Sequence, residues 1–129
     1  MSVRVNILDN GEGIEILATD VVTGHEIIEA HEKIYEKSHL SNQKYHIIDK
    51  SKCTEYVVTA EDIESIAKLD KKASEINPNI VIAIIESESL QFSLTGLWQL
   101  HVEDSVFKTK SFTDRNTAVE WIAESRKRN

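Results

Sequence analysis

The sequence predicts a single α/β domain in which helices cover a mostly parallel sheet. Two short apolar runs, Tyr45–Asp49 and Ile80–Ile85, have the character of strands that are buried on both faces, which is typical of parallel sheets. Strand-like and helix-like patterns also alternate along the chain, and this alternation favours right-handed β-α-β crossovers. The length of 129 residues suits one domain, residues 1–129, and no composition shift marks a linker.

The chain begins with a predicted β-hairpin. Apolar and polar residues alternate over Val3–Leu8, and a strand pattern returns over Ile14–Thr19. The residues between them, Asp9–Gly13, tolerate positive φ angles and suit a slightly long turn. We therefore expect an antiparallel edge strand next to the parallel part of the sheet.

Capping patterns predict where the first two helices begin. Thr23 and Glu26 match a capping box, in which each side chain bonds the backbone N–H of the other residue. This first helix is expected to end near Ser38. The second helix begins with Thr59 as its N-cap and ends at Asn77, just before a proline.

The second half of the chain repeats the alternation of helix and strand. Apolar residues at helical spacing predict a third helix over residues 90–101. A short strand is expected at Phe107–Phe112, and Thr113 then caps a last helix. The predicted element order is β-β-α-β-α-β-α-β-α.

Composition excludes several classes of function. The net charge of −7 is spread along the chain, so binding to nucleic acid is not expected. The longest apolar run, Ile80–Ile85, is too short to cross a membrane. The single cysteine, Cys53, rules out an internal disulfide, and the N-terminus lacks the apolar run of a secretory signal. A cytoplasmic location is the resulting expectation.

The element order, with an acid ending the third strand and a serine two residues later, resembles the STAS group of SpoIIAA-like domains. In signalling members of that group, this strand enters an Asp-Ser/Thr-Ser-Gly turn whose second serine is phosphorylated by a partner kinase. The corresponding residues here are Asp49, Lys50, Ser51 and Lys52. Two of the four positions depart from the pattern, and seven further residues, Cys53–Thr59, precede the helix. The chain therefore resembles a divergent SpoIIAA-like branch.

We expect the segment after Asp49 to form a long polar loop at the carboxyl end of a central strand, where sites in parallel sheets usually lie. Ser51 could carry a phosphate between its two lysine neighbours, or it could simply stabilise a turn. Cys53 could be a nucleophile, or an inert buried thiol. The predicted binding or regulatory residues are Asp49, Lys50, Ser51, Lys52, Cys53 and Thr59.

The histidines show no metal-ligand spacing, so neither a metal nor another cofactor is expected. His31 and His101 nevertheless fall on apolar helical stripes, and Asp70 interrupts the stripe of the second helix. These polar residues either belong to the core and have buried partners, or they face a pocket for a small apolar or lipid-like ligand.

An apolar patch is predicted at the start of the third helix, formed by Leu90, Phe92 and Trp98. It could bind a partner protein or a second copy of the chain, or it could pack under the preceding loop. The resulting hypothesis is a non-enzymatic STAS-like protein-interaction or regulatory module. The alternative is a domain that binds a small apolar ligand. No catalytic residue is predicted.

Overall fold

The computed structural model describes residues 2–87 and 107–127, and it confirms the α/β class. The five strands of its sheet lie in the order β1-β2-β3-β4-β5, which is also their order along the chain. β1 is antiparallel to β2, and the other neighbouring strands are parallel. The strands are β1 Val3–Leu8, β2 Gly13–Thr23, β3 Tyr45–Val57, β4 Val81–Ile85 and β5 Lys108–Phe112.

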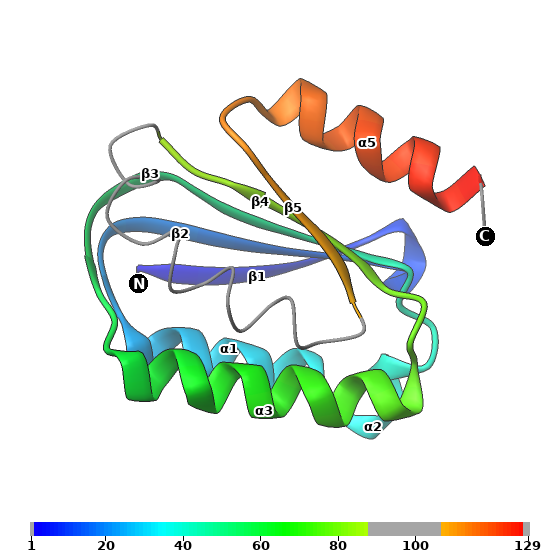
Figure 1. Cartoon of the computed structure of the whole chain (residues 1–129), viewed down its shortest axis with the longest axis horizontal. Helices are drawn as coiled ribbons and strands as arrows, with labels where there is room; N and C mark the ends of the chain where they lie inside the picture. The colour runs from blue at the N-terminus through cyan, green and yellow to red at the C-terminus, as the bar shows by residue number, and fades with distance from the viewer. Residues whose placement is uncertain (1, 88–106, 128–129) are drawn as a thin grey trace.

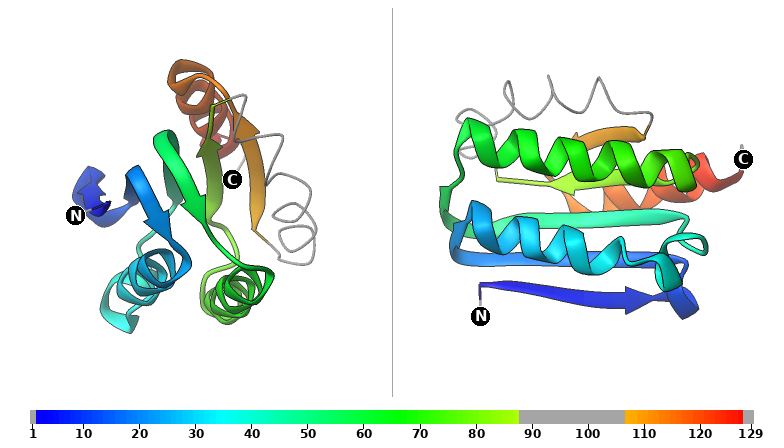
Figure 2. Two further views of the ribbon diagram at one scale, coloured as in Figure 1. Left: turned by 90° about the vertical axis from the view of Figure 1, so that its left-hand side faces the viewer. Right: turned by 90° about the horizontal axis from the view of Figure 1, so that it is seen from below.

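Helices cover both faces of the sheet. α1 and α3 lie side by side on one face, and α5 lies on the other (Figures 1 and 2). The bounds are α1 Gly24–Ile34, α2 Lys37–Leu40, α3 Ala60–Ile76 and α5 Arg115–Lys127, with a short 3-10 turn, η1, at Asp9–Gly11. The predicted helix over residues 90–101 lies outside the described residues. No described helix combines the length and the apolar character that a membrane crossing requires.

The hydrophobic core has one layer on each side of the sheet. The layer under α1 and α3 is the larger and is rich in isoleucine, with Ile16, Ile48 and Ile84 contributed by three adjacent strands. The layer under α5 is built around Ala83 and Phe112. Because β3 and β4 contribute to both layers, their apolar runs are explained by burial on both faces.

Two of the three predicted helix caps are confirmed. Thr23 and Glu26 form a full capping box at α1, and Thr59 and Asp62 form another at α3. The cap predicted for the last helix is wrong by one residue. The Asp114 carboxylate, and not Thr113, accepts the Thr117 N–H at 3.0 Å, because an aspartate three residues before this N–H reaches it directly.

Two predicted boundaries also need correction. The first helix ends at Ile34 rather than near Ser38, because Glu36 adopts an extended backbone (φ −59°, ψ 139°) and separates α1 from α2. The strand predicted from Phe107 begins one residue later, at Lys108. In the first hairpin, Asp9, Asn10 and Gly11 all have positive φ angles, as their sequence predicts.

The largest correction concerns the segment after Asp49, which is not a loop. β3 continues to Val57 and stays paired with β2 through two register shifts, next to Ala18 and Asp20. Its pairing with β4 stops at Asp49. Residues 19–23 of β2 and 52–57 of β3 therefore extend past β4 as a two-stranded segment, which we call the ribbon.

Ion pairs hold α5 to the sheet at both of its ends. At the start of the helix, Arg115 binds the buried carboxylate of Glu15 and lies 3.0 Å from Asp49. Near the end of the helix, Arg126 lies 3.0 Å from Glu12. Asn6 also donates to Glu15, so this acid bonds two partners. The helix is thereby aligned along β2 and β3.

Replacing Arg115 by methionine should lower the free energy of unfolding by about 1–3 kcal/mol, because it leaves Glu15 with a buried charge that has lost its cation. Arg126→Met is the matched control on the same helix. Its acidic partners are exposed, so a loss of only about 0–1 kcal/mol is expected. Urea unfolding at neutral pH measures both values. Equal losses in the two variants would contradict the proposed difference in burial.

Candidate functional site

A buried ion pair lies where β3 and β4 stop pairing. Lys50 is 1% exposed and Glu86, the residue after β4, is 2% exposed. The Lys50 Nζ atom lies 3.9 Å from Oε2 of Glu86 and 4.7 Å from the ring centroid of Tyr56. Lys50 follows Ile48 by two residues, so it faces the layer under α1 and α3. The sheet therefore places a charged pair inside its larger core layer.

Burial controls the protonation of this cluster. It lowers the pKa of Lys50, while the carboxylate of Glu86 opposes that shift. Burial also raises the pKa of the Cys53 thiol, against the smaller opposite effect of Lys50. The pKa of the Tyr56 hydroxyl is raised by the same cause. Cys53 is thus held as a protonated thiol, and this form is a poor nucleophile.

The predicted site residues are divided between the two faces of the sheet. Lys50 and Cys53 are buried under α1 and α3, whereas Asp49 pairs with Arg115 of α5 on the opposite face. The exposed Ser51 hydroxyl donates to Asp49 at 2.6 Å. Ser51 lies within β3, so it does not begin a helix whose own N-terminus would favour a phosphate on it. Its phosphorylation stays a prediction.

The other two predicted positions are Lys52 and Thr59. Lys52 is exposed on the ribbon. Thr59 accepts the Asp62 N–H at 3.1 Å, so its predicted role as a helix cap is confirmed. Three further candidates, Leu90, Phe92 and Trp98, lie outside the described residues.

The ribbon has two different faces. Val22 and Tyr56 are paired neighbours that point into the core layer under α1 and α3. On the opposite face, Val21 is 46% exposed and Val57 is 48% exposed. α5 begins level with Asp49 and runs away from the ribbon, so it leaves this face uncovered (Figure 1). We call the exposed side chains Val21, Thr23, Lys52, Glu55 and Val57 the ribbon surface.

The polar residues on the helical stripes are core residues with buried partners. The Tyr35 hydroxyl donates to Asp70 at 2.6 Å, and the Nδ1 atom of His31 lies 2.9 Å from the carbonyl oxygen of Ile27. Burial raises the pKa of Asp70, while His31 and the Tyr35 hydrogen bond oppose this shift. These contacts satisfy the groups that suggested a ligand pocket. His101 lies outside the described residues.

A third histidine, His46, completes this buried polar region. Its Nε2 atom lies 2.7 Å from the side-chain oxygen of Gln43, and its ring lies 5.7 Å from that of Tyr35. Nδ1 of His46 has no hydrogen-bond partner among the described residues. Burial, with a smaller effect of His31, lowers the pKa of His46 to about 3. The imidazole is therefore neutral in the folded protein near pH 7.

Sequence patterns missed the partners in these clusters. Glu86 follows the β4 run as Lys50 follows the β3 run, and this equivalence was the one available signal for their pairing. Tyr35 lies on the apolar stripe of α1, but its contact with Asp70 joins residues 35 positions apart. A single sequence does not encode such a distant contact in its local spacing.

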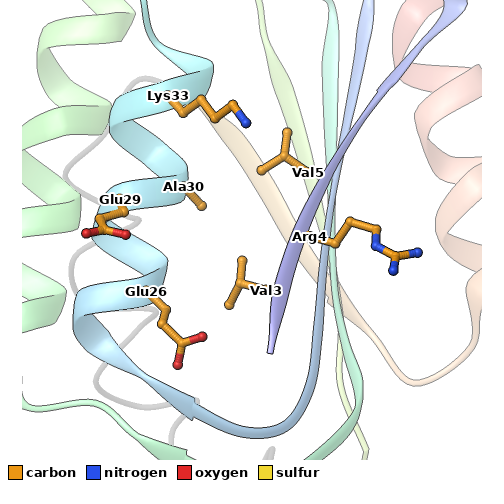
Figure 3. Close-up of a pocket in the computed structure, with 7 residues that line it drawn as sticks. All are labelled: Val3, Arg4, Val5, Glu26, Glu29, Ala30 and Lys33. Carbon is orange, nitrogen blue, oxygen red and sulfur yellow. The ribbon is translucent and has the colours of Figure 1, made fainter. Parts of the chain in front are cut away.

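Two grooves lie on the face of the sheet that α1 and α3 cover, away from the buried ion pair. The first, of about 580 Å³, lies between β1 and α1 and is lined by Val3, Val5 and Ala30 with charged residues around them (Figure 3). The second, of about 530 Å³, lies between α1 and α3, with Ile28 and Leu69 among its lining residues. Among the described residues, no group of three His, Cys, Asp or Glu side chains could hold a metal ion.

Comparison with known proteins shows the fold. No family model and no curated protein matches the chain. The chain is similar to the crystal structure of an uncharacterised protein of the DUF3478 family from Shewanella loihica PV-4, which has a SpoIIAA-like fold. The TM-score is 0.59 at 19% sequence identity, and the match covers 93% of this chain and 91% of the other. The chain therefore has a SpoIIAA-like fold, as its element order predicts.

Proposed function

We propose that the protein is a non-enzymatic protein-interaction module and that its ribbon surface binds the partner. The observation that carries this proposal is the pair of exposed valines, Val21 and Val57, on a part of the sheet that α5 leaves uncovered. In the strand register Val57 lies opposite Thr23, so Val21 is its diagonal neighbour on the same face. Lys52 and Glu55 add charges of both signs, as in the polar rim of an interface.

The inner side of the ribbon supports this role because it holds the surface in place. Val22 and Tyr56 anchor the two strands in the core, and the Tyr56 ring also contacts the amine of Lys50. A binding surface on paired strands loses less conformational entropy on binding than a loop does. Lys50 and Glu86, the buried charges next to the ribbon, therefore help to position it, and both are too buried to contact a substrate.

The chemistry of the cluster favours binding over catalysis. Cys53 is the single cysteine of the chain, and burial raises the pKa of its thiol. Lys50 is 1% exposed, so a substrate would have to enter the core layer to meet its amine. These properties agree with a positioning role for both residues.

The alternative function, binding of a small apolar ligand, has less support from the side chains that suggested it. It rested on His31, His101 and Asp70 facing a pocket. His31 and Asp70 bond partners in the core, and His101 lies outside the described residues. The open groove between α1 and α3 is the remaining place for such a ligand. The ribbon surface is therefore the better supported binding site.

Val21→Asp should reduce partner capture from a lysate of the source cells by at least about tenfold, because a charge at the centre of an apolar contact typically costs more than 1.4 kcal/mol. The matched control is Val119→Asp on α5, since Val119 is also 46% exposed. Quantitative mass spectrometry of the captured proteins measures the ratio. Thermal unfolding of both variants checks that the fold is retained.

Cross-linking through the exposed amine of Lys52 then locates the contact. The partner that depends on Val21 should also form cross-links to Lys52, and these should disappear in Val57→Asp. The proposal fails if every captured protein is retained equally by Val21→Asp and Val119→Asp. It also fails if the captured partner cross-links only to lysines away from the ribbon.

A further inference from the structure

The outer edge of β1 has the properties of a second, separate interaction surface. β1 pairs with β2 on one side, and no other described strand lies on its other side. Natural edge strands are usually protected by proline, lysine, a bulge or a covering segment. β1 contains no proline and its register with β2 is unbroken over Val3–Leu8. Its one charged residue, Arg4, lies on the opposite face of the strand from Val3, Val5 and Ile7. We propose that this edge binds the same edge of a second copy of the chain.

The backbone of β1 presents regular hydrogen-bonding groups to this edge. In antiparallel pairs, residues that bond the neighbouring strand alternate with residues whose N–H and C=O groups point away. The Thr19 N–H donates to the Ser2 carbonyl at 2.8 Å, so the even-numbered residues of β1 bond β2. The backbone groups of Val3, Val5 and Ile7 therefore point to the open edge.

A two-fold axis at Val5 pairs these groups without a mismatch. Val5 lies across from Val5 of the second copy, and Val3 lies across from its Ile7. Each of these positions has outward-pointing N–H and C=O groups, so each pair can exchange two hydrogen bonds. The contact uses the same residues on both copies, as a two-fold symmetric dimer requires. The result is one sheet that continues through both copies.

The side chains on this edge fit the same axis. Val3 and Val5 pack against the core on the α1 side, whereas Ile7, which alternation places on the same face, is 61% exposed. Pairing places Ile7 of each copy across from Val3 of the other, where the two side chains cover each other. The association therefore buries the most exposed large apolar side chain of the strand.

Sedimentation velocity over a wide concentration range tests the association. The wild-type protein should reach twice the chain mass of 14.7 kDa. Ile7→Lys should remain at the monomer mass, because it places a buried charge beside Val3 of the other copy. The matched control is Ile76→Lys on α3, a residue that is 58% exposed and lies away from β1. This control should associate like the wild type.

Hydrogen exchange measured by NMR locates the contact residue by residue. In the wild-type dimer, the N–H groups of Val5 and Ile7 should be protected, as is that of Asn6, which faces β2. In Ile7→Lys, only the Asn6 amide should stay protected. A monomeric wild type at every concentration would overturn the inference. So would a dimer in which the Val5 and Ile7 amides exchange freely. Both outcomes leave the ribbon surface and its partner unaffected.

Discussion

Replacing Glu86 by leucine is expected to lower the free energy of unfolding by about 3–5 kcal/mol. The substitution leaves the amine of Lys50 in the core layer without the carboxylate that lies 3.9 Å from it. Burial already lowers the pKa of Lys50, and without Glu86 it should fall further. Urea unfolding of the wild type and the variant at pH 7 measures the loss.

The double variant Lys50→Met/Glu86→Leu distinguishes the effect of an unpaired buried charge from the effect of altered side-chain packing. An apolar pair of similar volume removes both buried charges, so its stability should return to within about 1–2 kcal/mol of the wild type. A double-mutant cycle with the two single variants gives the coupling energy. If the double variant is as unstable as the sum of the singles, the charges are not coupled and this account of the cluster is wrong.

The folded protein should be sensitive to mild acid because of His46. Its pKa is about 3 when folded, against 6.5 for an ordinary histidine. Between these values the unfolded chain binds a proton that the folded chain does not. The free energy of unfolding should therefore fall by about 1.4 kcal/mol for each pH unit below 6.5, down to about pH 3.

The raised pKa of Asp70 acts in the opposite direction. Folded Asp70 binds its proton at a higher pH than in the unfolded chain, so its contribution to stability grows as the pH falls toward 3.8. A comparison of variants separates the two effects, because Asp70 is present in both proteins. Between pH 6.5 and 4.5, the wild type should lose about 2–3 kcal/mol more than His46→Gln.

Chemical denaturation at several pH values gives the slope of the free energy of unfolding against pH for each protein. This slope does not depend on the constant loss of stability that the substitution itself causes. His39→Gln is the control, since His39 is exposed at α2. It should keep the wild-type slope. Parallel pH profiles for the wild type and His46→Gln would show that His46 protonates equally easily in both states, against the expectation.

The elements that were predicted correctly are those determined by neighbouring residues. The capping box at Thr23 and the N-cap at Thr59 each depend on residues within three positions, and both form as expected. The turn at Asp9–Gly11 depends on residues that tolerate positive φ. The alternation of these local patterns predicted the α/β class, and the resemblance to SpoIIAA-like domains implied the SpoIIAA-like fold.

The segment Lys50–Val57 was misassigned because its burial depends on distant residues. Lysine rarely lies in a core, and Lys50 is buried with Glu86, 36 residues later in the chain. Two register shifts also interrupt the two-residue period that would have indicated a strand. The location of the candidate site was predicted from the sheet, but its division between two faces required the strand register.

The order of the strands in the sheet has a consequence for synthesis of the protein on the ribosome. Because spatial order equals chain order, each new strand can pair beside the previous one as it emerges. The face under α5 is different, because the buried acid Glu15 pairs with Arg115, which is synthesised a hundred residues later. A nascent chain should therefore form the α1 and α3 side first. Its other face stays open to chaperones until the last helix arrives.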